Sequence, residues 1–396
     1  MTVRRYEDLT PEEMEIYRKF YEWQKTGWDG VPSGEDYLPL IAIRYTPEEA
    51  ELLTGMRLYI PQKLSVIAGM KNMDPAALEE KLDACAGKGL VFRDTKNGEP
   101  RYYLHDMILS QRMWGAPGPS DEAARQYAIL ADRMLPTDIK VYVKPPEKPN
   151  RVIPIRQTVE DDRTIRPYED MDQLLASFSY FCEGNCLCRI RINMAGRPHE
   201  HESNIKNCLH FDKLAHYMVE NGLAREITRQ EAADILRDSA ERGLILSMTN
   251  IQHEPDTICS CCKCCCTWIE GLHKRLHGGS FSASNYRVHL DADLCTGCGL
   301  CVKRCQMEAI TLIDMPSAKG RKIEVKGKGK DGKERRLVNK TGKVSAVDLA
   351  GCVGCGVCSY KCPSKALTMK RNDIEHAPPE KGIDLLTHWL TVNEAP

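Results

Sequence analysis

The residues of this chain that could carry chemistry are above all its cysteines. Nineteen occur among 396 residues: one at position 85, four within 182–208, six within 259–266 and eight within 295–362. Thiolates at this density repel one another unless a metal ion or cluster neutralises their charge. The first residues contain no apolar export segment, so we expect a reducing, cytoplasmic location where clustered cysteines bind metal rather than form disulfides.

Two cysteine runs in the C-terminal part share the spacing C-x2-C-x2-C-x3-C. The runs are Cys295, Cys298, Cys301 and Cys305, and then Cys352, Cys355, Cys358 and Cys362. With this spacing, three thiolates of a run hold one [4Fe–4S] cluster and the fourth reaches the cluster of the other run. The predicted ligands of cluster one are therefore Cys295, Cys298, Cys301 and Cys362. Those of cluster two are Cys352, Cys355, Cys358 and Cys305.

Residues 285–371, which contain both runs, resemble the bacterial-type ferredoxin that carries two [4Fe–4S] clusters. The resemblance implies a pseudo-symmetric pair of βαβ units and the transfer of single electrons. We place the whole domain at residues 281–380. It departs from the family pattern at Gln306, where a proline usually follows the fourth cysteine, and in the insert 316–344 between the two halves.

The insert is rich in Lys, Arg and Gly, and it predicts a surface hairpin or loop. A solvated excursion is the favoured interpretation, and a basic docking patch for an acidic redox partner is the alternative. Its Gly-Lys repeats lack the order G-x4-G-K-[ST], so a phosphate-binding loop is not expected.

Residues 166–280 form a second cysteine-rich region, which we predict to be an α/β metal-binding domain. Its ten thiols exceed the four ligands that one cubane cluster needs. In an extended strand the C-x-C spacing places Cys186 and Cys188 on the same side. The candidate ligands of a third site are Cys186, Cys188 and Cys208, with either Cys261 or Cys262 completing it. A further iron–sulfur cluster is favoured over zinc, which also accepts four thiolates. His199 and His201 are expected in an exposed polar loop.

Residues 35–112 predict a small helical domain that ends in a β-hairpin. A helix beginning at Asp74 is followed by two strands with Asn97-Gly98 at their turn, and this order resembles a winged helix. The helix is acidic, so it would repel a phosphate backbone; a protein-docking or structural role is favoured over DNA binding. Cys85 recurs at helical spacing with apolar residues and is expected in the core.

The remaining segments are predicted to be a helical arm at 1–34, a helix and proline-rich linker at 113–165 and a tail at 381–396. The net charge of −1 gives no overall reason to expect nucleic-acid binding. The sequence contains no apolar run of the roughly 20 residues that a membrane span needs. Together these segments predict an α+β multidomain protein, whose oligomeric state we leave open.

The order of the predicted domains is similar to that of multidomain 4Fe–4S binding proteins of anaerobic bacteria and archaea. The leading hypothesis is an electron-transfer protein that serves redox partner proteins through two [4Fe–4S] clusters, with a third cluster in the middle domain. One alternative is an electron-feeding subunit or catalytic part of an anaerobic oxidoreductase. The other is an iron–sulfur redox sensor acting through the winged helix. No catalytic residue is assigned, since neither a nucleotide-binding glycine motif nor a nucleophile triad occurs.

Overall fold

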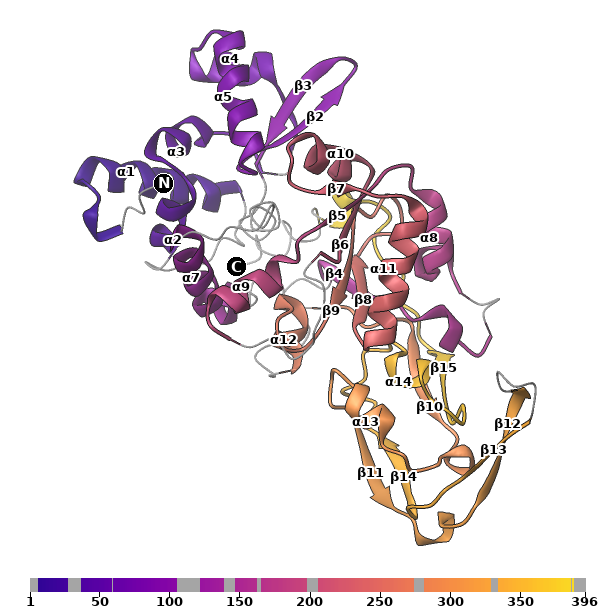
Figure 1. The fold of residues 1–396 in the computed structure, drawn as a ribbon. Helices are drawn as coiled ribbons and strands as arrows, with labels where there is room; N and C mark the ends of the chain where they lie inside the picture. Colours follow the sequence, from indigo (N-terminus) through magenta and orange to yellow (C-terminus); the bar gives the residue numbers. More distant parts are fainter. Residues whose placement is uncertain are drawn as a thin grey trace.

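The structure is a computed structural model of the chain, and it shows three parts in sequence order (Figure 1). The described residues are 6–27, 37–58, 60–104, 122–138, 147–161, 165–197, 206–273, 281–328, 334–385 and 387. His199 and His201 lie outside them. Within the described ranges, no helix has both the length and the apolar character required to cross a membrane.

The N-terminal part consists of helices followed by a small three-stranded sheet in the order β1-β3-β2. Its elements are α1 (Pro11–Gly27), α2 (Tyr37–Arg44), α3 (Pro47–Leu53), β1 (Gln62–Lys63), α4 (Leu64–Lys71), α5 (Pro75–Gly87), β2 (Phe92–Lys96) and β3 (Glu99–Tyr103). Asp74 caps α5 by accepting hydrogen bonds from two backbone N–H groups, as predicted. Asn97 and Gly98 both have positive φ, which the predicted two-residue hairpin turn requires.

Cys85 is 3% exposed within α5, so its predicted place in the core is confirmed. The α1 helix packs on this part of the same chain, where the Tyr17 hydroxyl donates to the Tyr45 carbonyl at 2.8 Å. The order of helices and strands is compatible with a winged helix. That assignment stays a prediction.

The middle part is built on a six-stranded sheet in the order β4-β8-β9-β6-β5-β7, whose neighbouring strands are antiparallel. Its strands are β4 (Asn150–Val152), β5 (Phe181–Gly184), β6 (Cys208–Phe211), β7 (Arg225–Glu226), β8 (Ile245–Thr249) and β9 (Thr257–Cys261). Its helices are α7 (Glu122–Asp138), α8 (Met171–Ser177), α9 (Leu187–Met194), α10 (Asp212–Glu220), α11 (Arg229–Arg242) and α12 (Thr267–His273).

Helices α8 and α11 pack with apolar side chains on one face of this sheet. On that face the strand residues Leu209 and Ile258 are fully buried. Successive residues of a strand point to opposite faces. Cys208 on β6 and Cys259 on β9 therefore point to the other face, and the two residues are direct partners across the antiparallel pair. The sheet thus gathers cysteines on the face that α8 and α11 leave uncovered.

The C-terminal part shows the predicted pseudo-symmetry, because the strand before each cysteine run pairs with the strand after the other run. Strand β10 (Tyr286–Leu290) pairs with β15 (Leu367–Arg371), and β11 (Ile310–Asp314) pairs with β14 (Lys343–Val347). Short helices α13 (Leu300–Arg304) and α14 (Val357–Tyr360) lie within the runs. The insert forms a separate hairpin of β12 (Lys322–Lys328) and β13 (Glu334–Val338).

Two glycines show how tightly the cysteine loops are held. A Cβ on Gly354 would lie 2.0 Å from the Tyr286 carbonyl oxygen, and a Cβ on Gly297 would lie 2.4 Å from that of Lys343. Both glycines also have positive φ, so a side chain there would be disfavoured by the backbone conformation as well as by these short distances. Each cysteine loop is therefore packed against the strand that precedes the other run.

Candidate metal centres

The four predicted ligands of cluster two meet at one small apolar cavity of about 20 Å³. Its cysteines are Cys305, Cys352, Cys355 and Cys358. The first of these belongs to the other run, so the fold brings together the residues that interleaved ligation requires. The Sγ of Cys305 accepts a hydrogen bond from the backbone N–H of Ala309 at 3.3 Å. Such N–H···S bonds are one of the means by which a protein sets a cluster's potential.

The predicted ligands of cluster one lie around the other loop. Cys295 and Cys362 contact the same apolar cluster, and the Sγ of Cys295 accepts a hydrogen bond from the Ser345 N–H at 3.4 Å. The Ser345 hydroxyl also lies 3.1 Å from the Sγ of Cys301. Cys298 is exposed, unlike any ligand of cluster two. Cluster one is therefore the more accessible of the two sites.

Two of the predicted ligands of cluster two, Cys355 and Cys358, are shielded from water. Burial raises the pKa of Cys355 to about 12 and raises the pKa of Cys358 further above its ordinary value. Protein groups alone would therefore keep these thiols protonated at neutral pH. A metal cluster reverses this preference because it binds the thiolate form. This chemistry fits the [4Fe–4S] group that the cysteine spacing predicts.

The middle part contains a second cysteine-lined cavity, of about 40 Å³. We call it the thiol pocket. The cysteines that line it are Cys186, Cys188, Cys208, Cys259, Cys261, Cys265 and Cys266. They come from the β5–α9 junction, the two neighbouring strands β6 and β9, and the turn before α12. Three separate segments of sequence thus contribute sulfur to a single site.

Within the thiol pocket, five sulfurs form a connected series. Cys186 hydrogen-bonds to Cys188, Cys188 to Cys266, Cys266 to Cys261, and Cys261 to Cys259. The hydrogen bonds from Cys186 and Cys266 lower the pKa of Cys188 well below its ordinary value, and nearby Arg191 lowers it further. Cys188 is therefore the thiol best prepared to ionise and bind a metal.

The expected strand at the C-x-C pair is wrong. Strand β5 ends at Gly184, Cys186 caps α9 in an extended conformation, and Cys188 lies in the first helical turn. This segment forms a helix rather than a strand because its apolar residues, including Leu187 and Ile190, are buried at helical spacing. The two thiols nevertheless line the same cavity.

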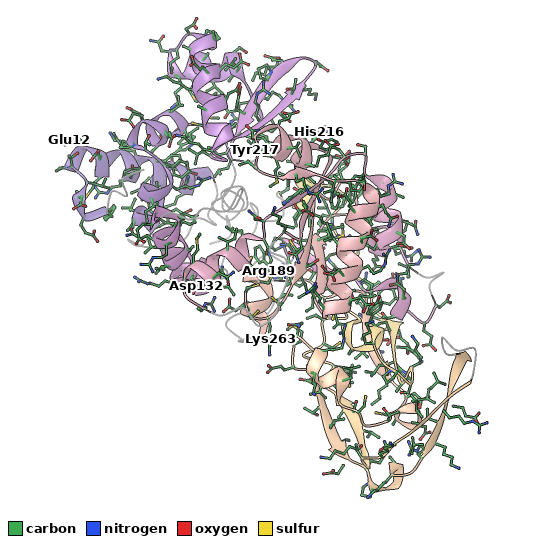
Figure 2. All side chains as sticks on the ribbon, viewed as in Figure 1. Glu12, Asp132, Arg189, His216, Tyr217 and Lys263 are labelled. Carbon is green, nitrogen blue, oxygen red and sulfur yellow. The ribbon has the colours of Figure 1, made fainter. Side chains whose placement is uncertain are left out.

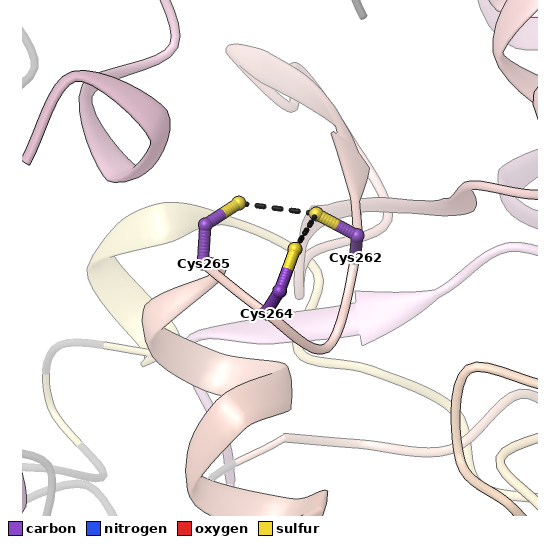
Figure 3. Close-up of side chains that lie close together, drawn as sticks. All are labelled: Cys262, Cys264 and Cys265. Atoms are coloured by element: carbon purple, nitrogen blue, oxygen red, sulfur yellow. Dashed lines mark hydrogen bonds between the residues drawn. The ribbon is translucent and has the colours of Figure 1, made fainter. Parts of the chain in front are cut away.

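A second group of sulfurs adjoins the thiol pocket in the turn after β9. The Sγ of Cys262 lies 3.2 Å from that of Cys264 and 3.1 Å from that of Cys265 (Figure 3). The hydrogen bond with Cys264, together with burial, raises the pKa of Cys262 to about 12. We call these three residues the thiol trio. Their sulfurs are mutually close enough to share a single metal ion.

Buried arginines supply positive charge beside these sulfurs. Arg189 is 1% exposed and donates to the carboxamide oxygen of Asn207 and to the Ser260 carbonyl (Figure 2). Burial acts to lower its pKa, but four neighbouring thiols outweigh burial and raise it, so Arg189 remains a cation. A fixed cation favours an anionic cluster and makes its reduction easier.

A network of charged side chains holds the far side of this region. Arg191, buried in α9, pairs with Asp132 of α7 and Glu270 of α12, and its guanidinium donates to the Cys265 carbonyl at 3.0 Å. Arg197 bridges the same two carboxylates at 2.6 and 2.7 Å. The network fixes α9 and α12, which carry the pocket's cysteines, relative to each other.

The structure brings together most of the predicted third-site residues. Cys186, Cys188, Cys208 and Cys261 line the thiol pocket, whereas Cys262 belongs to the thiol trio. Sequence reasoning did not select Cys266, although its position just before a helix was a usable signal. Cys259 was also missed, and only the pairing of β6 with β9 reveals that it faces Cys208.

Comparison with known proteins identifies the C-terminal part. Residues 294–366 match the family described as "4Fe-4S dicluster domain". The chain is 33% identical over 92 residues to a protein named "Putative ferredoxin-3" from Sinorhizobium fredii, a match that covers 23% of this chain and 83% of that protein. It is 29% identical over 91 residues to ferredoxin-3 of Rhodobacter capsulatus, a match that covers 23% of this chain and 87% of that protein. No solved structure matches.

These matches and the interleaved pairing define the C-terminal part as a dicluster ferredoxin domain, which holds two [4Fe–4S] clusters. Through this domain the chain belongs to the 4Fe–4S dicluster ferredoxin family. The reported matches cover less than a quarter of the chain, so the N-terminal and middle parts receive no assignment from them.

Proposed function

We propose that the protein passes single electrons between the two ferredoxin clusters and a third cluster in the thiol pocket. One contact carries this proposal. Lys263, which lies between two cysteines of the thiol trio, donates its backbone N–H to the Gln306 side chain at 3.3 Å. Gln306 directly follows Cys305, the thiol that reaches into cluster two. The cysteine-rich turn is therefore in direct contact with the loop that carries a ligand of cluster two. Figure 2 labels Lys263 at this boundary.

Other contacts at this boundary hold the loop of cluster two against the middle part. The backbone N–H of Ile155 donates to the Cys355 carbonyl at 3.2 Å. Arg304 donates to the Ala240 and Glu241 carbonyls at the end of α11, at 2.8 and 3.0 Å. Such a fixed arrangement suits electron transfer because the two redox centres stay close together and do not have to meet by diffusion.

For the third cluster we propose the ligands Cys186, Cys188, Cys261 and Cys266. They are four successive members of the connected series of sulfurs, they line one cavity, and they come in two pairs from two segments. Four thiolates suit a [4Fe–4S] cluster, and the neighbouring ferredoxin clusters favour iron over zinc as the occupant. Cys208 and Cys259 then form a second row of sulfur on the sheet.

A redox titration of anaerobically purified full-length protein, followed by EPR, tests the electron-transfer proposal. We expect three separate one-electron steps, with spin–spin interaction between cluster two and the third cluster when both are reduced. Two steps would remove the third cluster from the path. Three steps without any interaction would contradict the proposed contact between the centres.

A second candidate function rests on a different observation, a cavity of about 630 Å³ beside the thiol pocket. Its volume lies within the range of small-molecule sites. Its lining is mixed: the apolar side chains of Phe92, Phe211 and Met218 are buried, and polar residues join them, namely His210, Asp212, Lys213, Glu254, Asp256 and Lys381. His210 lies two residues from Cys208 on β6, so the cavity and the thiol pocket share one face of the sheet. This neighbourhood favours an oxidoreductase that exchanges electrons with an apolar organic molecule.

Filling this cavity distinguishes the two functions. Met218→Trp should block access of an organic acceptor such as menadione, which takes up two electrons from two reduced clusters and two protons to form the hydroquinone. If the cavity is a substrate site, the variant slows reoxidation of the reduced protein by menadione but leaves its reoxidation by a protein acceptor unchanged. If the variant slows reoxidation by menadione and by the protein acceptor equally, or slows neither, the substrate-site function is wrong and electron transfer alone remains.

For the N-terminal part we propose a structural role within the chain. The Tyr217 hydroxyl of α10 donates to the Ala86 and Val91 carbonyls at 2.8 and 2.9 Å, and its ring stacks on Phe92 at 4.3 Å. The end of α5 and the start of the hairpin are thus bound to the middle part. This arrangement supports the structural interpretation over a DNA-reading regulator.

A further inference from the structure

The insert of the ferredoxin domain concentrates positive charge. Residues 316–344 contain eleven Lys/Arg against three Asp/Glu, a formal net charge of +8 in a chain whose net charge is −1. Strands β12 and β13 form a two-stranded sheet of their own among the described residues, and the hairpin projects beside the β11–β14 pair (Figure 1). An isolated hairpin of two strands is at most marginally stable in water, so its persistence requires anchoring.

The base of the insert is anchored on the loop of cluster one. The Asn339 side-chain amide, completely buried, donates to the Cys295 carbonyl at 2.9 Å and to the Lys343 carbonyl at 2.8 Å. The Thr341 hydroxyl donates to the Gly297 carbonyl at 3.4 Å. The base of the insert is therefore part of the wall around cluster one.

Cluster one is also the end of the domain that a partner can reach. Cys298 is exposed, and Leu300 and Ile313 near this end of the domain are 38% and 47% exposed. Cluster two is covered instead by residues 155–158, where a Cβ on Gly356 would lie 2.5 Å from the Thr158 hydroxyl oxygen. Of the two ferredoxin sites, cluster one is therefore the one with an exposed ligand.

Two acidic side chains on this side of the domain are paired with basic residues of the insert. Asp293 pairs with Arg321 at 3.1 Å, and Asp314 pairs with Lys343 at 3.6 Å. The exposed lysines Lys319, Lys322 and Lys340 form no ion pair with the acidic residues that the structure describes. The surface around cluster one thus combines uncompensated cations with exposed apolar side chains.

We propose that the base of the insert, with Lys319, Lys322 and Lys340, and the exposed edge of cluster one form the docking surface for a small acidic redox protein. This inference rests on the proposed electron-transfer function and adds the chemistry of the partner. Positive charge beside the accessible cluster accelerates and orients the approach of a negatively charged protein. The exposed apolar residues near the cluster then provide the close contact that electron transfer needs. Nucleic acid also binds basic surfaces, and the test includes it.

The test measures binding of the oxidised full-length protein to flavodoxin, a small acidic flavoprotein. Cytochrome c, a basic protein, serves as the control of opposite charge. We expect flavodoxin to bind at about 50 mM salt and to lose at least tenfold in affinity at about 300 mM, because salt screens exposed charges. The variant with Lys319→Glu, Lys322→Glu and Lys340→Glu should lose at least tenfold at low salt. A matched variant with Lys19→Glu, Lys81→Glu and Arg133→Glu, which carries the same change in net charge, should bind as the unchanged protein does.

Equal flavodoxin binding by the insert variant and the matched variant would overturn the docking proposal. Tighter binding of duplex DNA than of flavodoxin, lost in the insert variant, would overturn it in favour of nucleic acid. Electron transfer from the reduced clusters to the flavin is measured separately. Flavodoxin that binds through the insert but is never reduced contradicts the electron-transfer function, while the surface itself still stands.

Discussion

The side-chain carbonyl of Gln306 accepts a hydrogen bond from the backbone N–H of Lys263, and its amide donates to the Gly243 carbonyl at 3.1 Å. Gln306 is 5% exposed, so both bonds are shielded from water. A proline, usual at this position in ferredoxins, could make neither bond. The departure from the family pattern is therefore the residue that connects the ferredoxin domain to the cysteine-rich turn.

Replacing Gln306 with Ala should loosen this turn without removing a metal ligand. The loss of the two buried hydrogen bonds should cost about 1–3 kcal/mol. Amide hydrogen exchange of residues 262–266 should accelerate by roughly tenfold to a hundredfold, since about 1.4 kcal/mol corresponds to a factor of ten. Exchange in the β10–β15 pair is the internal control. Unchanged exchange in the turn would mean that the contact contributes nothing.

Interleaved ligation makes a prediction about Cys305. The Cys305→Ala variant should damage cluster two, although Cys305 is nearer in sequence to the ligands of cluster one. EPR of the reduced protein should show the loss or conversion of one ferredoxin signal. The reciprocal Cys362→Ala variant should damage the other signal. If both substitutions affect the same signal, the interleaved assignment is wrong.

The isolated fragment 281–380 should take up both of its clusters on anaerobic reconstitution, about eight iron atoms in all. Its two clusters should differ in stability, however, because the fragment lacks residues 155–158 and α11, which cover the loop of cluster two. We expect cluster two to lose iron on exposure to air faster in the fragment than in the full-length chain. Cluster one should decay at the same rate in both, and a uniform decay would contradict the covering role.

Two cysteines are expected to bind no metal. Burial raises the pKa of Cys85 to about 12 and that of Cys182 also to about 12. Because only the thiolate is nucleophilic, both should resist iodoacetamide at about pH 8 in the folded protein and react after unfolding. A raised thiol pKa stabilises the fold below the ordinary value of 9.0, and this contribution is lost as the pH rises towards about 12. Mass spectrometry of the native protein measures the modification, and rapid labelling of Cys85 would contradict its burial.

The sequence predicts features that depend on neighbouring residues. The hairpin turn at Asn97-Gly98, the cap at Asp74 and the C-terminal repeat of cysteine spacing all follow from local chemistry. The C-x-C pair was misjudged because local spacing fits both a strand and a helix start, and burial of the helix's apolar face decides between them. The thiol pocket itself could not be predicted, because it forms only when β6 and β9 pair and α9 is fixed by distant carboxylates.

Iron and acid-labile sulfide per chain, measured on anaerobically purified full-length protein, test the central claim most directly. The account predicts about twelve iron atoms for the unchanged chain and about eight for the variant with Cys188→Ser, Cys261→Ser and Cys266→Ser, since each cubane holds four. The control variant with Cys85→Ser and Cys182→Ser should keep about twelve. About eight iron atoms in all three proteins, or zinc in place of the third cluster, would contradict a three-cluster electron path.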